Sequence, residues 1–268
     1  MGPAEAAAIE ESVRVFVDAW KLMVARFPAG AITHAAGVST ALGNVALPFF
    51  NVSMHDGPLA DTAALRRALA LGVARASVCP HPWMIGLCED WSPSGWETVA
   101  TEFGLAPAMS LTGMATDCLL PPRRALPDLE IRRVADTTTT RDLATVNMHA
   151  YGMPAALFEC MNGMHLWNAD GFGCVGYEDR RPVSAAAAFP VAGTVYVAFV
   201  ATMPDAQGKG YAEAAMRHAI AEGRQAMGFT RTTLHATEMG APLYRNMGFA
   251  ANARFRLLAA DGRGGGGH

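Results

Sequence analysis

The sequence predicts a mixed α/β protein made of two consecutive domains, each with a sheet flanked by helices. Three observations support this prediction. The chain has 268 residues, more than the ~100 to 200 of a typical single domain. Short apolar stretches of strand length alternate with amphipathic helical segments. A segment rich in proline and arginine, PPRRALPD, interrupts the chain at 121–128 and has the composition of an exposed linker.

We therefore expect one domain at 1–120, the linker at 121–128 and a second domain at 129–260. In the first domain the amphipathic pattern predicts a helix at 8–27, where Phe16 lies on the apolar side, and Asp61 is a good N-cap. The full expectation for this half is helices at 8–27, 61–75 and 95–103, and strands at 37–43, 45–54, 83–88 and 108–119.

In the second half, the sequence pattern predicts a strand, two helices and three strands, followed by a helix, a strand, a helix and a strand. A run of threonines starts the first helix, which ends near Tyr151, and Pro154 suits the first turn of the next. The expected strands are 129–136, 171–177, 182–189, 194–202, 230–237 and 249–258, and the expected helices are 137–151, 154–167, 208–227 and 241–247. The glycine-rich segment 261–268 is expected to be a flexible tail.

Composition excludes several classes of protein. Hydrophobic residues make up 51% and charged residues 17% of the chain, which is not the composition of a disordered protein. A net charge of -3 offers no basic field for nucleic acid. No apolar run reaches the length of about 18 residues needed for a membrane span, and acidic residues stand where a secretory signal would be basic. Five cysteines without C-x-x-C spacing predict reduced thiols. We expect a cytoplasmic protein that is a monomer or homodimer.

The most informative stretch is MPDAQGKGYAEAAM, residues 203–216, where an apolar strand breaks at Pro204 and a glycine-rich turn leads directly into a helix. Gly208 and Gly210 allow several backbone N–H groups to face one point, and the helix dipole there favours an anion such as a pyrophosphate. A P-loop would need Ser or Thr at Gly210, and a dinucleotide fingerprint would need Gly or Ala at Glu213. A tight turn that binds nothing is the alternative.

Two segments in register resemble one family. The string 207–212, QGKGYA, is similar to the Q/R-x-x-G-x-G/A motif of the GNAT superfamily of acetyl-CoA-dependent acyltransferases. The segment LYRNMGF, 243–249, resembles the L-Y-x-x-x-G-F segment that follows this motif in the family. The resemblance covers residues 129 to about 258, and it implies a mixed, mostly antiparallel sheet flanked by helices, with acetyl-CoA as co-substrate and no metal.

The resemblance also implies roles for particular residues. The turn would bind the CoA pyrophosphate through backbone N–H groups, the end of the preceding strand would pair with the pantetheine arm, and Tyr244 would protonate the departing thiolate. A packing role is the alternative for Tyr244. The implied cofactor-binding residues are Val200, Ala201, Thr202, Gln207, Gly208, Lys209, Gly210, Tyr211 and Ala212.

The sequence departs from the family in two places. Many members carry an acidic residue on the strand before the turn, where this chain has Ala198 and Phe199, and Thr237 replaces a frequent asparagine. The general base is therefore open. The candidates are His235 and Glu238 near Tyr244, and His149, Glu159 and His165 on the two expected helices. For each of them a solvated or hydrogen-bonded structural role is the alternative.

The first half, from about Gly37, repeats the later part of the GNAT order of elements. Its equivalent turn, MHDGPLADTAAL, has one glycine, and Asp56 and Asp61 would repel a pyrophosphate. The chain thus resembles bacterial tandem GNAT-like proteins with a degenerate first half. An unrelated α/β domain is the alternative.

These observations favour an enzyme that transfers an acetyl group from acetyl-CoA to a small-molecule acceptor, most often an amine, by direct attack. A methionine- and aromatic-rich stretch at 147–167 predicts an apolar acceptor pocket, although a role in the core is the alternative. The predicted acceptor residues are Met148, Tyr151, Phe158, Glu159 and Met161. A non-catalytic acyl-CoA-binding or regulatory protein and a protein N-acetyltransferase are the alternative functions.

Overall fold

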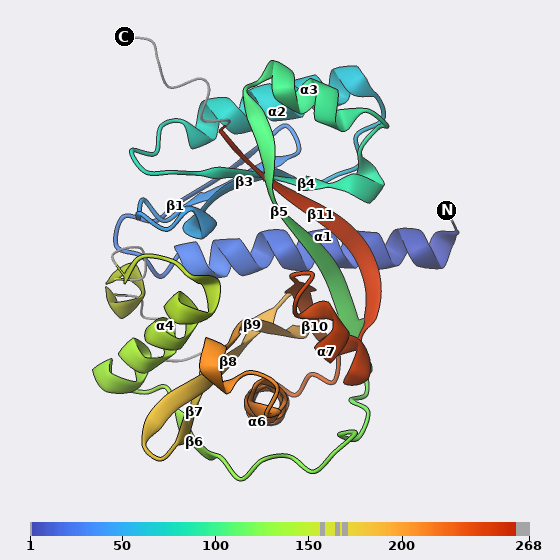
Figure 1. Cartoon of the computed structure of the whole chain (residues 1–268). Coiled ribbons are helices and arrows are strands. Elements are labelled where there is room, and N and C mark those ends of the chain that lie inside the picture. Colours follow the sequence, from blue (N-terminus) through green and yellow to red (C-terminus); the bar gives the residue numbers. More distant parts are fainter. Residues whose placement is uncertain (1, 156–158, 164–166, 168–170, 261–268) are drawn as a thin grey trace. The chain divides into compact units, whose positions relative to one another are not determined.

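The computed structural model describes residues 2–155, 159–163, 167 and 171–260 (Figure 1). The chain divides into two compact units. Unit 1 contains the residues up to Gly113, together with Ala236–Met239 and the residues from Ala251 on. Unit 2 contains Met114–His235 and Gly240–Ala250.

The sheet of unit 1 mixes antiparallel pairs with one parallel pair. Its strands are β1 (Ala31–Ala35), β2 (Val38–Leu42), β3 (Asn51–His55), β4 (Met84–Cys88), β5 (Leu105–Thr116) and β11 (Ala250–Ala260), in the order β1-β2-β3-β4-β11-β5. β3 and β4 run parallel, because the helix between them returns the chain to the same edge. β11, the last strand of the chain, pairs antiparallel with β4.

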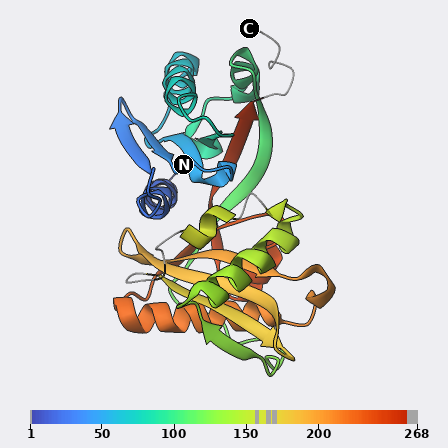
Figure 2. The same cartoon turned by 90° about the vertical axis from the view of Figure 1, so that its left-hand side faces the viewer.

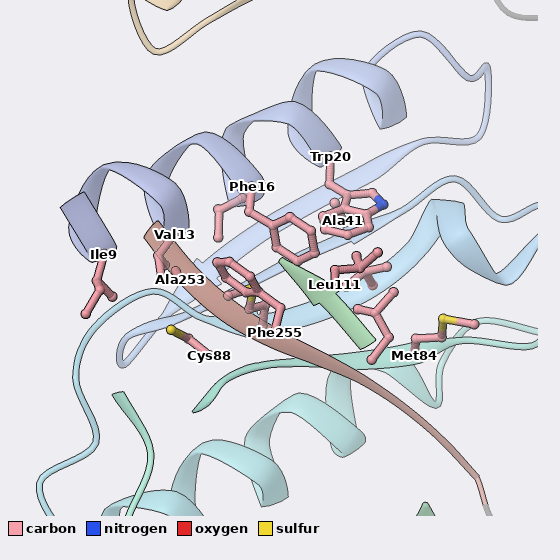
Figure 3. Packing of buried hydrophobic residues seen from close by; sticks show 14 of the residues in the cluster. Ile9, Val13, Phe16, Trp20, Ala41, Met84, Cys88, Leu111, Ala253 and Phe255 are labelled. Carbon is pink, nitrogen blue, oxygen red and sulfur yellow. The ribbon is translucent and has the colours of Figure 1, made fainter. Parts of the chain in front are cut away.

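Helices cover both faces of this sheet. They are α1 (Pro3–Val24), α2 (Thr62–Ala76) and α3 (Trp96–Glu102), with 3-10 turns η1 (Pro48–Phe50) and η2 (Glu89–Trp91). α1 buries its apolar side on one face, where Phe16 stacks on Phe255 with ring centroids 4.7 Å apart (Figure 3). α2 and α3 pack on the other face around Leu65 and Leu87. Burial of these side chains is the main stabilisation, at about 25 cal/mol per Å² of apolar surface.

The sheet of unit 2 has the order β10-β9-β8-β7-β6. Its strands are β6 (Glu130–Arg133), β7 (Phe172–Glu178), β8 (Arg181–Val191), β9 (Thr194–Thr202) and β10 (Thr232–Ala236). β9 and β10 are parallel, while β6 to β9 pair antiparallel. The chain passes from β9 to β10 through the glycine turn and a long helix, so the turn lies at the carboxyl end of β9.

The helices of unit 2 lie on opposite faces of its sheet (Figure 2). They are α4 (Thr137–Tyr151), α6 (Tyr211–Met227) and α7 (Ala241–Asn246), with 3-10 turns η3 (Glu159–Gly163) and η4 (Pro204–Ala206). Alternation along β7 explains the two layers. Cys174 reaches Ala215 of α6, whereas the Tyr177 hydroxyl donates to Asp142 of α4 at 2.6 Å.

The predicted fold class is confirmed: the chain has a mixed α/β fold with two compact units, each a mostly antiparallel sheet flanked by helices. Some elements differ from the prediction. β1 was missed because the turn that joins it to β2, Ala36 and Gly37 with positive φ, carries only one glycine as a signal. β3 begins at Asn51 because Pro48 starts a 3-10 turn.

Two further differences concern the second half of the chain. The helix expected at 154–167 is described only as η3, and 156–158 and 164–166 lie outside the described residues. β11 was expected to close the second domain, but it pairs with β4 of unit 1. A strand's partner across the chain leaves no local pattern in the sequence. The domain limits and the linker remain a prediction, and the expected tail at 261–268 lies outside the described residues.

Candidate active site

The site begins where β9 and β10 separate. Their parallel pairing runs from Val195 opposite Thr232 to Val197 opposite Leu234, whereas β9 itself continues to Thr202. Beyond this point β9 keeps only its antiparallel pairing with β8. The backbone of β9 beyond Val197 is therefore outside the described pairing with β10, and an extended ligand can pair with it.

A bulge shapes this end of β9. Phe199 has φ of +55°, and the register between β8 and β9 shifts beside it. The side chain of Asn147, from α4, donates to the Phe199 carbonyl at 3.3 Å and to Leu143 of its own helix at 3.0 Å. Asn147 is buried, with 1% of its surface exposed. It thus fixes the bulge that aims the last residues of β9, and sequence reasoning missed it because one polar residue in a helix has no distinctive pattern.

The glycine turn joins β9 to α6. Gly208 and Gly210 have φ of +78° and +88°, a region that side chains with a Cβ rarely adopt. Gly210 is the N-cap of α6 and has no side-chain cap, so the first N–H groups of the helix face outward. A Cβ at Gly208 would meet nothing within 4 Å. The turn has the open face and the donors that an anion needs.

Charged side chains around the turn are paired with one another. Lys209 lies 3.1 Å from Glu178, and the Tyr211 hydroxyl also donates to Glu178. These hydrogen bonds, with that from Tyr211 the larger, lower the pKa of the Glu178 carboxyl. Arg181 pairs with Asp205 at 2.7 Å. The side chains of Lys209 and Tyr211 are therefore held at the side of the turn, while their backbone stays in it.

Tyr244 lies on α7, in unit 2. Its ring rests on Gly240, where a Cβ would come within 3.0 Å of it, and is close to Phe249 at 6.1 Å between centroids. Only 8% of the side chain is exposed. Burial, and then the nearby Tyr151 and Tyr196, raise the pKa of Tyr244. Its hydroxyl is thus protonated at neutral pH, as a proton donor must be.

His235 and Tyr196 form a pair on neighbouring strands. His235 Nδ1 lies 3.3 Å from the Tyr196 hydroxyl, and the rings are 5.8 Å apart. Tyr196 is buried, which raises its pKa and keeps it neutral. His235 is half-buried. Sequence reasoning named His235 but missed Tyr196. The two residues come together through the pairing of β9 with β10, which leaves no local pattern in the sequence.

The other predicted residues are more dispersed. Glu238 is exposed, and its role as a base stays a prediction. His149 and Glu159 are exposed, and His165 lies outside the described residues.

Of the predicted acceptor residues, Met148 is half-buried and Tyr151 has 41% of its surface exposed, although desolvation of its hydroxyl raises the Tyr151 pKa. Met161 is 1% exposed, which favours the core role. Phe158 lies outside the described residues.

The site fits an acyl-CoA on features of its own. Thr202, at the end of β9, has a buried hydroxyl without a hydrogen-bond partner among the described residues. Such a group is costly unless a ligand satisfies it. The buried Thr202 hydroxyl, the end of β9 beyond its pairing with β10, and the N–H groups at the start of α6 are the polar groups that a pantetheine arm and a pyrophosphate would need.

Comparisons with known proteins agree with this geometry. Residues 138–249 match the sequence model of the acetyltransferase (GNAT) family. A GCN5-related N-acetyltransferase from Kribbella flavida is similar in structure, with a TM-score of 0.69, 21% identity and 96% of each chain covered. One from Sphaerobacter thermophilus has a TM-score of 0.56 and 14% identity, covering 96% of this chain and 93% of that one.

A tandem GNAT protein from the clavulanic acid biosynthesis pathway has a TM-score of 0.56 and 11% identity, covering 93% of this chain and 94% of that one. No curated protein matches the sequence. At these identities the solved structures show a shared fold.

No group of three or more His, Cys, Asp or Glu side chains in the described ranges is arranged to hold a metal ion. Among the helices that the structure describes, none is both long and apolar enough to cross a membrane.

Proposed function

Because residues 138–249 match the acetyltransferase (GNAT) family, we propose that this chain transfers an acetyl group from acetyl-CoA to a small-molecule amine. One observation carries the proposal: β9 separates from β10 after Val197 and then leads through a glycine turn to the uncapped start of α6. A thioester co-substrate with a pyrophosphate matches both ends of this feature. We place this activity in the cytoplasm.

In this proposal, backbone groups hold the co-substrate. Residues 200–202 of β9 pair with the pantetheine arm as an added strand would, and one of their amides faces the thioester oxygen. The N–H groups of 207–212 bind the pyrophosphate. Acetyl-CoA supplies the activated acyl carbon, and the protein supplies position and proton transfer.

His235 acts as the general base and Tyr244 as the acid. His235, whose Nδ1 lies 3.3 Å from the Tyr196 hydroxyl, takes the proton of the amine, directly or through a water. The C–N bond forms, the C–S bond breaks, and the Tyr244 hydroxyl gives its proton to the CoA thiolate. After the reaction His235 releases its proton to solvent, and Tyr244 takes up one proton from solvent, so both residues return to their starting states.

We propose a mostly apolar or aromatic acceptor with one nucleophilic amine. On the face of the sheet covered by α4, Met148 and Tyr151 stand near the start of the predicted acceptor stretch, and Met can adapt to irregular ligands. Glu159 is the only acidic side chain in 147–167, so a polycation would find few partners. Phenethylamine should have a higher kcat/KM than spermidine, and a clear preference for spermidine would contradict this.

The experiment that tests the function is the release of free CoA thiol from acetyl-CoA with a panel of amines. Turnover that depends on the amine, with one acetylated product per thiol released, supports the proposal. Tight binding of acetyl-CoA without turnover for any amine would support the alternative, a non-catalytic acyl-CoA-binding protein. Ala198, at the position where many family members carry an acidic residue, is the observation that favours this alternative.

A further inference from the structure

We propose that Arg124, from the segment 121–128 outside the family match, binds the pyrophosphate of CoA and so completes the cofactor site. This inference rests on the proposed function. Arg124 Nη2 donates to the Gly208 carbonyl at 2.8 Å. A Cβ at Gly210 would come within 3.3 Å of Arg124 Nη2 and 3.4 Å of Pro127. The guanidinium therefore lies directly beside the glycine turn.

The charge balance around the turn singles out Arg124. Lys209 is paired with Glu178, and Arg181 is paired with Asp205, so each of these cations is compensated. The hydrogen bond of Arg124 goes to a carbonyl, and no carboxylate in the described part of the chain forms an ion pair with it. Among the described residues, Arg124 is thus a cation beside the turn that no carboxylate compensates.

The chemistry of the guanidinium suits this role. It has five N–H donors, and the bond to Gly208 uses one of them. A phosphate group held by the N–H groups at the start of α6 would lie next to the remaining donors, because the guanidinium already borders Gly210. Guanidinium groups bind phosphate oxygens through paired, charge-assisted hydrogen bonds.

Arg124 lies in the sequence before the segment that matches the family. The family match begins at residue 138, so the motif QGKGYA supplies backbone donors and the segment before the match supplies the charge. The Gly208 carbonyl holds the guanidinium in place before the ligand arrives. Such preorganisation lowers the entropy lost on binding.

Calorimetric titration of the full chain tests the proposal, with CoA and with dephospho-CoA, which lacks the 3′-phosphate but keeps the pyrophosphate. The variants are Arg124→Gln, Arg124→Lys and, as a matched control, Arg123→Gln at the exposed neighbouring position. We expect Arg124→Gln to weaken both ligands equally, by about 10- to 100-fold, the effect of losing a hydrogen bond to a charged group. Arg124→Lys should recover part of the loss, and Arg123→Gln should change little.

A second measurement separates charge from support of the turn. The affinity of the wild type for CoA should fall more steeply with salt than that of Arg124→Gln, because an ion contact is screened. An unchanged salt dependence, a loss confined to CoA, or unaltered affinity in Arg124→Gln would each overturn the proposal. If the wild type binds neither ligand, the proposed function itself fails, which is a different result from binding that ignores Arg124.

Discussion

Two parallel β-α-β crossovers lie in the described part of the chain, β3-α2-β4 in unit 1 and β9-α6-β10 in unit 2, and they differ at the carboxyl end of the first strand. In unit 2, β9 separates from β10 after Val197. In unit 1, Met54 pairs with Gly86, and the next residue, His55, bridges the two strands. Its Nε2 accepts from the Cys88 N–H at 3.0 Å, and its Nδ1–H donates to the Gly57 carbonyl at 2.7 Å.

The N-termini of α2 and α6 also differ, since a side chain of the protein occupies the first and not the second. Asp61 caps α2, because its carboxylate accepts from the Ala64 N–H at 2.7 Å. The start of α6 is capped by Gly210, which has no side chain. The anion-binding position of unit 1 is therefore occupied by a carboxylate of the protein itself, whereas the corresponding position of unit 2 is open to a phosphate.

The cavity beside His55 fits this difference. It lies between α2, β3 and β4 and has a volume of about 10 Å³, which is room for roughly one water molecule. Sites for small molecules usually have ~300 to 1,000 Å³, and CoA is a large ligand. Under the proposed function, a few side chains would decide whether such a crossover binds CoA: in unit 1, a histidine between the strands and an aspartate at the helix start occupy the positions that are open in unit 2.

The largest expected effect comes from Gly210→Glu. It places a side chain at φ of +88° and a negative charge where phosphate oxygens would approach, so we expect CoA binding to be lost in a folded variant. Gly57→Glu, in the corresponding turn of unit 1, is the matched control, because a Cβ there would meet nothing within 4 Å. Calorimetry measures both. Unchanged CoA affinity in Gly210→Glu would refute the assignment of the turn.

The next effect is that of Tyr244→Phe on turnover. We expect kcat to fall by roughly 10- to 10,000-fold with little change in CoA affinity, because water can replace a positioned acid only in part. Steady-state kinetics at saturating acetyl-CoA, together with a CoA titration, measure the two quantities separately. Wild-type turnover, or an equal loss of binding, would assign Tyr244 a packing role.

A smaller effect is expected from Asn147→Leu, which removes the donor to the Phe199 carbonyl at the bulge. The described pairings of β3 in unit 1 contain no bulge, so the crossover β3-α2-β4 has no counterpart of this contact. We expect the KM for acetyl-CoA to rise about 10-fold, as for the loss of roughly 1.4 kcal/mol of positioning. A fall in melting temperature with unaltered KM would mean that Asn147 only stabilises the fold.

The smallest effect concerns the stability of unit 1. Burial lowers the pKa of His55 below its ordinary value of 6.5, so the unfolded chain binds the proton more readily than the folded one. The contribution of neutral His55 to the free energy of unfolding is thus fully present above pH 6.5 and is lost as the pH falls below that value. His55→Gln should be less stable at pH 7.5, by about 1 to 3 kcal/mol, but should lose less on acidification. Urea unfolding at pH 5 and 7.5 measures this. An equal change in the free energy of unfolding between the two pH values in the wild type and in His55→Gln would contradict it.

Much of this contrast was predictable from the sequence, because it depends on residues close together in the chain. QGKGYA and LYRNMGF indicated the open turn and Tyr244, and Asp56 and Asp61 indicated a turn unsuited to phosphate. Turn and cap residues act on backbone groups within a few positions, so their effect is visible locally.

The rest depends on contacts between distant residues. His55 and Cys88, Asn147 and Phe199, and Arg124 and Gly208 meet only because the sheet and helices bring them together. The pairing of β11 with β4 likewise joins residues 164 or more positions apart, as in the contact of Arg254 with Asp90. No periodicity or spacing carries that information, and such long-range choices are set by the packing of the whole unit.

The most direct test of the difference between the crossovers is the stoichiometry of CoA binding to the wild-type chain, measured by calorimetry with a known active protein concentration. One CoA per chain is expected, bound in unit 2, and Gly210→Glu should abolish it while Gly57→Glu retains it. Two sites per chain, or one site that survives in Gly210→Glu and is lost in Gly57→Glu, would contradict the account.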